Sequence, residues 1–156
     1  MNDFDRLTYE CGICQIHVNR LELAINRTQH LYPFNANILE KVSEEELGFL
    51  EIFSTRFSKL QDALGEKVFS LLLKCLGEDI ERKSFIDKLN KLEKLELIPS
   101  AEWWKNLREL RNILTHEYPD DPDFIAATLN EAILETKKLI EFWQKLEKYI
   151  LLNIKS

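Results

Sequence analysis

The sequence predicts an all-α fold: an antiparallel helical bundle of four main helices with one or two short helices. Apolar residues recur at intervals of three and four in every long segment, which is the period of an amphipathic helix. No segment alternates like a strand, and four glycines and four prolines are few for a turn-rich β fold. A length of 156 residues suits one domain, so we expect residues 1–156 to share one core.

The first helix is predicted to run from Thr8 to His30 and to end before Pro33. Its apolar positions follow the helical period and are expected to face the core: Cys11, Cys14, Val18, Leu21 and Ile25. Residues 33–42 are predicted to form a connector.

The cysteines allow two interpretations. Cys11 and Cys14, followed by His17, have the spacing of half a zinc site. His30 and Cys75 are conceivable further ligands, but no second cysteine pair exists to complete a tetrahedral set. Buried thiols on the core stripe are therefore the favoured interpretation, and we expect no metal.

The second main helix begins with a capping box, in which Ser43 and Glu46 satisfy backbone groups of the first turn. Helical spacing continues to Cys75 through Leu50, Phe53, Phe57, Leu60, Leu64, Val68 and Leu71. The pattern predicts one long helix bent at Gly65, or two collinear helices. Gly77 is the predicted stop.

A short helix is predicted over residues 84–95, with Ile86, Leu89 and Leu92 facing inward. Pro99 then breaks the chain and Ser100 can cap the next helix, predicted over residues 101–116. Its core stripe is predicted to be Trp103, Leu107, Leu110 and Leu114. Pro119 cannot continue this helix.

The last helix is predicted to follow Asp121 as its cap, with Pro122 in the first helical position. Its apolar stripe is Ile125, Leu129, Ala132, Thr136, Leu139, Trp143, Leu146 and Ile150. This alternating spacing of three and four suits packing against antiparallel neighbours.

Charge and hydropathy restrict the partners. The formal net charge of −6 opposes general attraction to nucleic acid, so any RNA contact must come from a local basic patch. No charged-then-apolar leader begins the chain, and no apolar run reaches about 18 residues. We therefore expect a cytoplasmic protein without a membrane segment.

The stretch RNILTHEY, residues 111–118, concentrates the chemically useful side chains. On a wheel of about 100° per residue, Arg108, Asn112 and His116 share one exposed face, with Lys105 close by. Arg111 lies at the border of the core face, about 140° from His116. These two could converge through the long arginine side chain, through unwinding before Pro119, or across two copies of the helix.

This set of groups suits metal-free RNA cleavage, in which the 2′-hydroxyl attacks the adjacent phosphate. Histidine can act as base or acid near neutral pH, and arginine can bind phosphate as a fork. One chain offers a single histidine in this setting, whereas a two-fold dimer offers two.

A simpler interpretation is a solvated helix face. His116 can satisfy backbone carbonyls at a helix end, and Asn112 can be exposed filler. Acidic residues also crowd the motif and could repel RNA: Glu109, Glu117, Asp120 and Asp121. Trp104 lies on the flank of Arg111, where contact with another subunit is the favoured expectation and contact with a base the alternative.

Arg111-Asn112-x-x-x-His116-x-Tyr118 resembles the signature of the HEPN superfamily, and within it most closely the HepT-like toxins. The setting is similar too, late on the third main helix of an α-bundle, before a proline-containing turn and a long last helix. The likeness spans about residues 43 to 149.

The resemblance implies a metal-independent, cofactor-free ribonuclease that acts as a homodimer, with both subunits lining a shared cleft. Arg111 would bind and polarise the scissile phosphate, His116 would transfer protons, and Asn112 would orient the site. Arg108 and Lys105 would add positive charge for RNA binding.

The resemblance further implies a toxin–antitoxin module. A partner nucleotidyltransferase antitoxin would neutralise the toxin by adding AMP to the motif tyrosine, Tyr118. The alternative is a non-catalytic HEPN module that binds a nucleotidyltransferase partner or a nucleotide.

Overall fold

The computed structural model describes residues 1–116 and 121–156, and these residues form an all-α fold without strands. In chain order the elements are α1 (Asp3–Thr28), the 3₁₀ turn η1 (Gln29–Leu31), α2 (Ala36–Glu40), α3 (Glu44–Asp62), the π-helical segment η2 (Ala63–Val68), α4 (Phe69–Cys75), α5 (Phe85–Lys94), α6 (Ala101–Thr115) and α7 (Pro122–Asn153). The predicted all-α class is confirmed.

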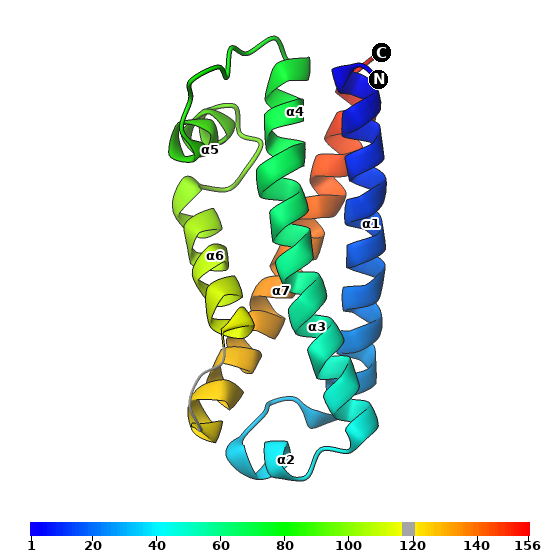
Figure 1. The fold of residues 1–156 in the computed structure, drawn as a ribbon, viewed down its shortest axis with the longest axis vertical. Coiled ribbons are helices and arrows are strands. Elements are labelled where there is room, and N and C mark those ends of the chain that lie inside the picture. Colours follow the sequence, from blue (N-terminus) through cyan, green and yellow to red (C-terminus); the bar gives the residue numbers. More distant parts are fainter. Residues whose placement is uncertain (117–120) are drawn as a thin grey trace.

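The long helices alternate in direction along the chain (Figure 1). The column formed by α3, η2 and α4 runs back along α1, and α6 and α7 follow in opposite directions. This column packs against α1, α6 packs against both α3 and α7, and α5 packs against α4 and α6. The short α2 packs against the beginning of α7 at one end of the molecule.

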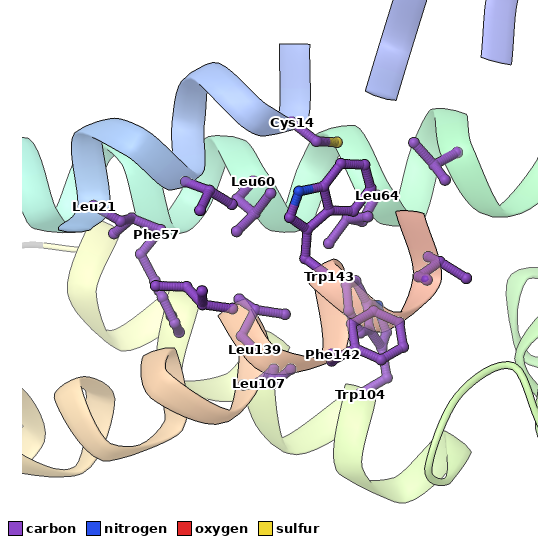
Figure 2. Packing of buried hydrophobic residues seen from close by; sticks show 14 of the residues in the cluster. Cys14, Leu21, Phe57, Leu60, Leu64, Trp104, Leu107, Leu139, Phe142 and Trp143 are labelled. Carbon is purple, nitrogen blue, oxygen red and sulfur yellow. The ribbon is translucent and has the colours of Figure 1, made fainter. Parts of the chain in front are cut away.

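One hydrophobic core cluster takes residues from α1 through α7, from Leu7 to Ile154. Its largest fully buried side chains are Trp104, Trp143, Phe53, Phe57 and Phe69. Figure 2 shows Trp143 of α7 reaching between Cys14 of α1 and Leu64 of η2. The indole nitrogen of Trp143 donates to Oε1 of Gln15 at 3.0 Å, which satisfies the polar atom of this inserted ring.

The helix boundaries that carry clear capping signals lie where the sequence predicts them. Ser43 and Glu46 form the complete capping box of α3, and Oδ1 of Asp121 accepts from the backbone of α7. Gly77 adopts φ 81°, and hydrogen bonds from Gly77 and Glu78 back into the last turn of α4 close the helix.

Two boundaries near the N-terminus differ from prediction. Helix α1 begins at Asp3 rather than Thr8, because Asn2 accepts from the backbone of Asp5 and starts the helix earlier. The predicted connector 33–42 contains α2, which Asn35 caps. This segment is held by a long-range contact, since the Asn130 side chain accepts from and donates to the backbone of Phe34.

Where the sequence predicts a helix bent at Gly65 or two collinear helices, the π-helical segment η2 joins α3 and α4. A Cβ atom on Gly65 would touch the rings of Phe85 and Trp104 at 3.4 Å. Glycine therefore lets α5 and α6 approach this segment closely.

Several side chains predicted to face the core are not fully buried: Ile25, Cys75, Trp103 and Leu114 are half-buried, and Ile86 and Ile125 are exposed. Helix α5 buries Leu89 and Leu92 but not Ile86, and Ile125 lines an open groove at the start of α7. On α6, Trp104 is fully buried and Trp103 is half-buried against Phe142. The expectation that Trp104 touches a base or another subunit is wrong.

The thiols of α1 are core side chains, as the favoured interpretation predicts. Cys11 and Cys14 are buried, and burial raises the pKa of Cys11 to about 12. His17 is also buried, and its Nδ1 lies 3.1 Å from a guanidinium nitrogen of Arg56. Across residues 1–116 and 121–156, no helix has the length and apolar character needed to cross a membrane.

Candidate functional site

Helix α6 carries the motif and is fixed at its start by two side chains. Ser100 accepts from the backbone of Trp103 at 3.0 Å, and Oε1 of Glu93 accepts from the backbone of Ala101 at 2.8 Å. Helix α6 then buries Leu107 and Leu110 between α3 and α7. The motif is thus built on a rigid element with one face committed to the core.

Arg111 forms an ion pair with the last residue of α3. Its Nη2 lies 2.8 Å from Oδ2 of Asp62, and its Nη1 donates to Oδ1 of Asn112 at 3.3 Å. The arginine side chain is 27% exposed and that of Asp62 38%. Two of its three nitrogens therefore have acceptors within the chain, and the guanidinium is held between α3 and α6.

The third nitrogen of Arg111 is unusual. Its Nε is buried and has no hydrogen-bond partner among residues 1–116 and 121–156. A buried donor without a partner is costly, and because Nε is covered by neighbouring atoms, a ligand can reach it only if the side chain moves. A phosphate oxygen is the type of acceptor that an arginine fork binds best.

His116 lies at the point where α6 ends. Its backbone is extended, with φ −94° and ψ 140°, and its N–H still donates to the carbonyl of Asn112 at 3.2 Å. The hydroxyl of Thr115 donates to the carbonyl of Arg111 at 3.0 Å, so the last turn has few free acceptors. The imidazole of His116 is exposed, and among the described residues no hydrogen bond joins it to the last turn of α6.

His116 also lines an apolar groove of about 670 Å³ between α3, α6 and the start of α7. The other lining residues are Leu39, Leu47, Leu50, Glu51, Ser54, Thr55, Ile113, Leu114, Phe124, Ile125, Thr128 and Leu129. Leu47 and Ile125 are exposed, so the groove continues onto an apolar surface. Exposed apolar surface next to a motif histidine is a feature of protein–protein contact regions.

The remaining predicted site residues lie on the exposed face of α6. Asn112, Arg108 and Lys105 are all exposed, as the helical wheel predicts. Arg108 bends toward α5, with its Cζ 5.1 Å from the centre of the Phe85 ring. The ring contact orients the guanidinium of Arg108, and no carboxylate of the described residues forms an ion pair with it.

Within one chain, the structure does not bring Arg111 and His116 together. Arg111 points toward Asp62, whereas His116 lines the groove, and no hydrogen bond joins the two among the described residues. Of the three predicted routes to convergence, the reach of the arginine side chain is not used. The backbone does leave the helix at His116, but this unwinding does not carry the imidazole to Arg111.

Four residues of the motif region lie outside the described residues: Glu117, Tyr118, Pro119 and Asp120. The predicted modification site at Tyr118 and the predicted stop at Pro119 are among them. Of the crowding acidic residues, Glu109 is exposed and Asp121 caps α7. The described ranges contain no group of three or more His, Cys, Asp or Glu side chains placed to hold a metal ion.

Sequence reasoning missed two carboxylates that belong to this region. Asp62 pairs with Arg111 across 49 positions of sequence, and Glu51 lines the groove with His116. Glu51 is exposed and Asp62 half-buried on a long amphipathic helix, where carboxylates are ordinary. Only the packing of α3 against α6 distinguishes them from other surface charges.

Comparison of the chain with protein-family models, with curated proteins and with solved structures gives no match.

Proposed function

We propose that this protein is a metal-independent endoribonuclease toxin of the HEPN type, which cuts RNA at a site shared by two copies of the chain. The observation that carries the proposal is the placement of His116. Its imidazole is exposed at the end of α6, beside an apolar groove that a second copy can cover. A two-fold contact there supplies two imidazoles and two guanidiniums to one cleft.

The cleavage step uses the 2′-hydroxyl of the substrate as nucleophile. One His116 removes the proton from this hydroxyl as its oxygen bonds to phosphorus, and His116 of the partner subunit donates a proton to the departing 5′-oxygen. The bond from phosphorus to the 5′-oxygen breaks, leaving a 2′,3′-cyclic phosphate and a free 5′-hydroxyl. Arg111 stabilises the negative charge that develops on the phosphate oxygens.

Asp62 and Asn112 act as positioning residues in this scheme. They hold the guanidinium of Arg111 through Nη2 and Nη1 while leaving its Nε without a partner. Arg108 and Lys105, exposed on the same helix, supply the local positive charge that a chain of net charge −6 needs to attract RNA.

A second function is favoured by the same ion pair. Because Asp62 already neutralises Arg111, the guanidinium has a structural role that a non-catalytic HEPN module would also keep. Such a module would bind a nucleotidyltransferase partner or a nucleotide through α6 and would not cut RNA.

The deciding experiment compares purified wild-type protein with His116→Ala and Arg111→Ala on a defined RNA. We expect both variants to stay folded by circular dichroism and to lose cleavage by about 100-fold or more, as loss of a proton-transfer group or an electrostatic donor does. Matched controls are His30→Ala and Arg6→Ala, which remove an exposed imidazole and guanidinium from the N-terminal part of the chain.

Three further measurements define the mechanism. Cleavage should survive a chelator, products should carry a 2′,3′-cyclic phosphate, and a substrate lacking its 2′-hydroxyl should resist cutting. Full cleavage by His116→Ala would refute the assignment. Absence of cleavage by the wild-type chain, with a nucleotidyltransferase bound through α6, would establish the second function.

Regulation by a nucleotidyltransferase antitoxin is part of the first proposal. Transfer of AMP to Tyr118 would place a bulky anion two residues from His116 and exclude RNA by charge and size. Incubation with the partner enzyme and ATP should add mass at Tyr118, and a Tyr118→Phe variant should cut RNA but escape neutralisation. Neutralisation of that variant to the same extent would exclude tyrosine modification as the mechanism.

A further inference from the structure

The outward face of α1 carries an apolar stripe that the rest of the chain does not cover. We call the set Tyr9, Gly12, Ile16 and Leu23 the outer stripe. Tyr9 is 60% exposed, Ile16 49% and Leu23 36%. The three large members are seven residues apart, which is two helical turns, so they lie nearly in line. In Figure 1, α1 forms one edge of the molecule.

The fold leaves most of the outer stripe uncovered because α1 packs through its opposite side, although Tyr9 borders a groove shared with η2 and α4. Cys14 and Leu21 point into the core, as Figure 2 shows. On the two flanks, Gln15 bonds Trp143 of α7 and His17 bonds Arg56 of α3. The outer stripe lies beyond both flanks.

Gly12 lies within the outer stripe, and no contact inside the described chain requires a glycine at this position. A Cβ atom placed on Gly12 would meet nothing within 4 Å. Glycine weakens a helix interior, so it is kept where another backbone or a long side chain must approach closely. Close approach at Gly12 can come only from outside the described chain.

Charges at the two ends of the stripe are opposite and symmetrically placed. Asp5 precedes Ile16 by eleven residues and Arg27 follows it by eleven, which is about three turns in each direction. Both are exposed, and neither forms an ion pair among the described residues. Arg27 rests over the ring of Phe49, with its Cζ 5.7 Å from the ring centre.

We propose that the outer stripe binds the outer stripe of a second copy, with the two α1 helices antiparallel and a two-fold axis at Ile16. Residues whose numbers sum to 32 then face each other. Tyr9 packs on Leu23 of the partner subunit, and Ile16 packs on Ile16 of the partner subunit. Asp5 pairs with Arg27 of the partner subunit at both ends.

Gly12 completes this register. Its counterpart at the same distance from the axis is Arg20 of the partner subunit, a long side chain that needs the space a glycine leaves. In a parallel arrangement Asp5 would face Asp5 and Arg27 would face Arg27, so charge selects the antiparallel pairing.

This contact is separate from the proposed ribonuclease site. It uses α1, whereas the motif and the apolar groove belong to α3, α6 and α7. If both contacts form, the assembly contains more than two copies. The α1 contact is therefore testable by mass alone, whatever the catalytic activity of the protein.

The first test measures the mass of the full chain in solution by analytical ultracentrifugation at about micromolar concentration, a range typical of specific association. We expect the wild-type protein to be an oligomer and Ile16→Glu to halve its mass, since two glutamates would meet on the axis. Circular dichroism should show equal helix content. A wild-type monomer, or a mass that Ile16→Glu leaves unchanged, would overturn the proposal.

The second test is a charge exchange that identifies the register. Asp5→Arg alone and Arg27→Asp alone should each weaken association by roughly tenfold, and the double exchange should restore it. The matched control on the same helix is Glu22→Arg, which lies about 120° around α1 from Ile16 and should leave the mass unchanged. Failure of the double exchange to recover association would exclude the antiparallel register.

Discussion

At the scale of single residues, the environment of Arg111 decides what the motif can do. An arginine on an exposed helix face keeps its donors for solvent or ligand, whereas Arg111 gives two nitrogens to Asp62 and Asn112. The remaining Nε is buried without a partner. The side chain is therefore already oriented, which lowers the entropy that a phosphate contact would cost.

The role of Asp62 can be separated from stability by Asp62→Asn. A half-exposed ion pair contributes at most about 1 kcal/mol, so the melting temperature should change little. If Asp62 positions Arg111, RNA cleavage should fall by roughly tenfold or more because the guanidinium loses its orientation. Glu135→Gln, which removes an ion pair with Lys138 on α7, is the matched control. Unchanged cleavage by Asp62→Asn would show that the pair is purely structural.

His17 makes stability depend on pH. Burial, together with the charges of Arg56 and Lys59, lowers the pKa of His17 below its ordinary value of 6.5. Between these two pKa values the unfolded chain binds a proton that the folded chain does not. The contribution of His17 is therefore lost as the pH falls below about 6.5, and it is constant above that range.

The prediction for His17 is a difference between two proteins. From about pH 7.5 to pH 5.5, the free energy of unfolding in urea should fall more for the wild-type protein than for His17→Gln. Equal pH dependence of the two proteins would show that the buried imidazole accepts a proton without cost. His30→Gln changes an exposed histidine and leaves His17 in place. It should therefore keep the part of the pH dependence of the free energy of unfolding that arises from His17.

At the scale of elements, helix ends are where local chemistry is decisive. The capping boxes at Ser43 and Ser84 and the cap at Asp121 begin α3, α5 and α7 at the predicted places. Each satisfies backbone N–H groups that have no partner within the helix. Helix α6 ends at Thr115 because the backbone of His116 turns to an extended conformation after its N–H has made the last helical bond, to the carbonyl of Asn112.

Substitution by alanine should change the free energy of unfolding in opposite directions at Gly12 and Gly77. Gly12 lies within α1 with open space around it, so Gly12→Ala, made in the Ile16→Glu variant to exclude the proposed α1 contact, should raise the free energy of unfolding by about 0.5–1 kcal/mol. Gly77 has φ 81°, where an L side chain is strained, so Gly77→Ala should lower it by about 1–2 kcal/mol. Urea unfolding of both variants checks this pair. The same sign for both would contradict the backbone argument.

At the scale of the whole molecule, the proposed cleavage site requires two copies of α6. Specific RNA cleavage per chain should therefore fall when the protein is diluted until its mass drops to that of one chain. The fall should be the same for Glu22→Arg, because that position lies outside both contacts. A monomer that cuts RNA with undiminished specific activity would contradict a shared site.

Much of the fold could be predicted because helix periodicity, caps and breaks are local properties. The long helices, the break at Gly65 and the stop at Gly77 follow from patterns within a few turns of chain. The short α2 was missed because it depends on Asn130, almost a hundred residues away. The sequence predicts Trp103 in the core, but Trp104 is the fully buried ring, because the packing of α5, η2 and α7 determines which of the two rings fits there.

For the candidate site, the sequence by itself determined which residues share the exposed face of α6, since that follows from the turn of a helix. It also determined the all-α class, through the spacing of apolar residues. Only the tertiary structure placed Asp62 against Arg111, put His116 beside a groove and left the outer stripe of α1 uncovered. These are contacts between segments distant in sequence, and their geometry depends on how whole helices pack.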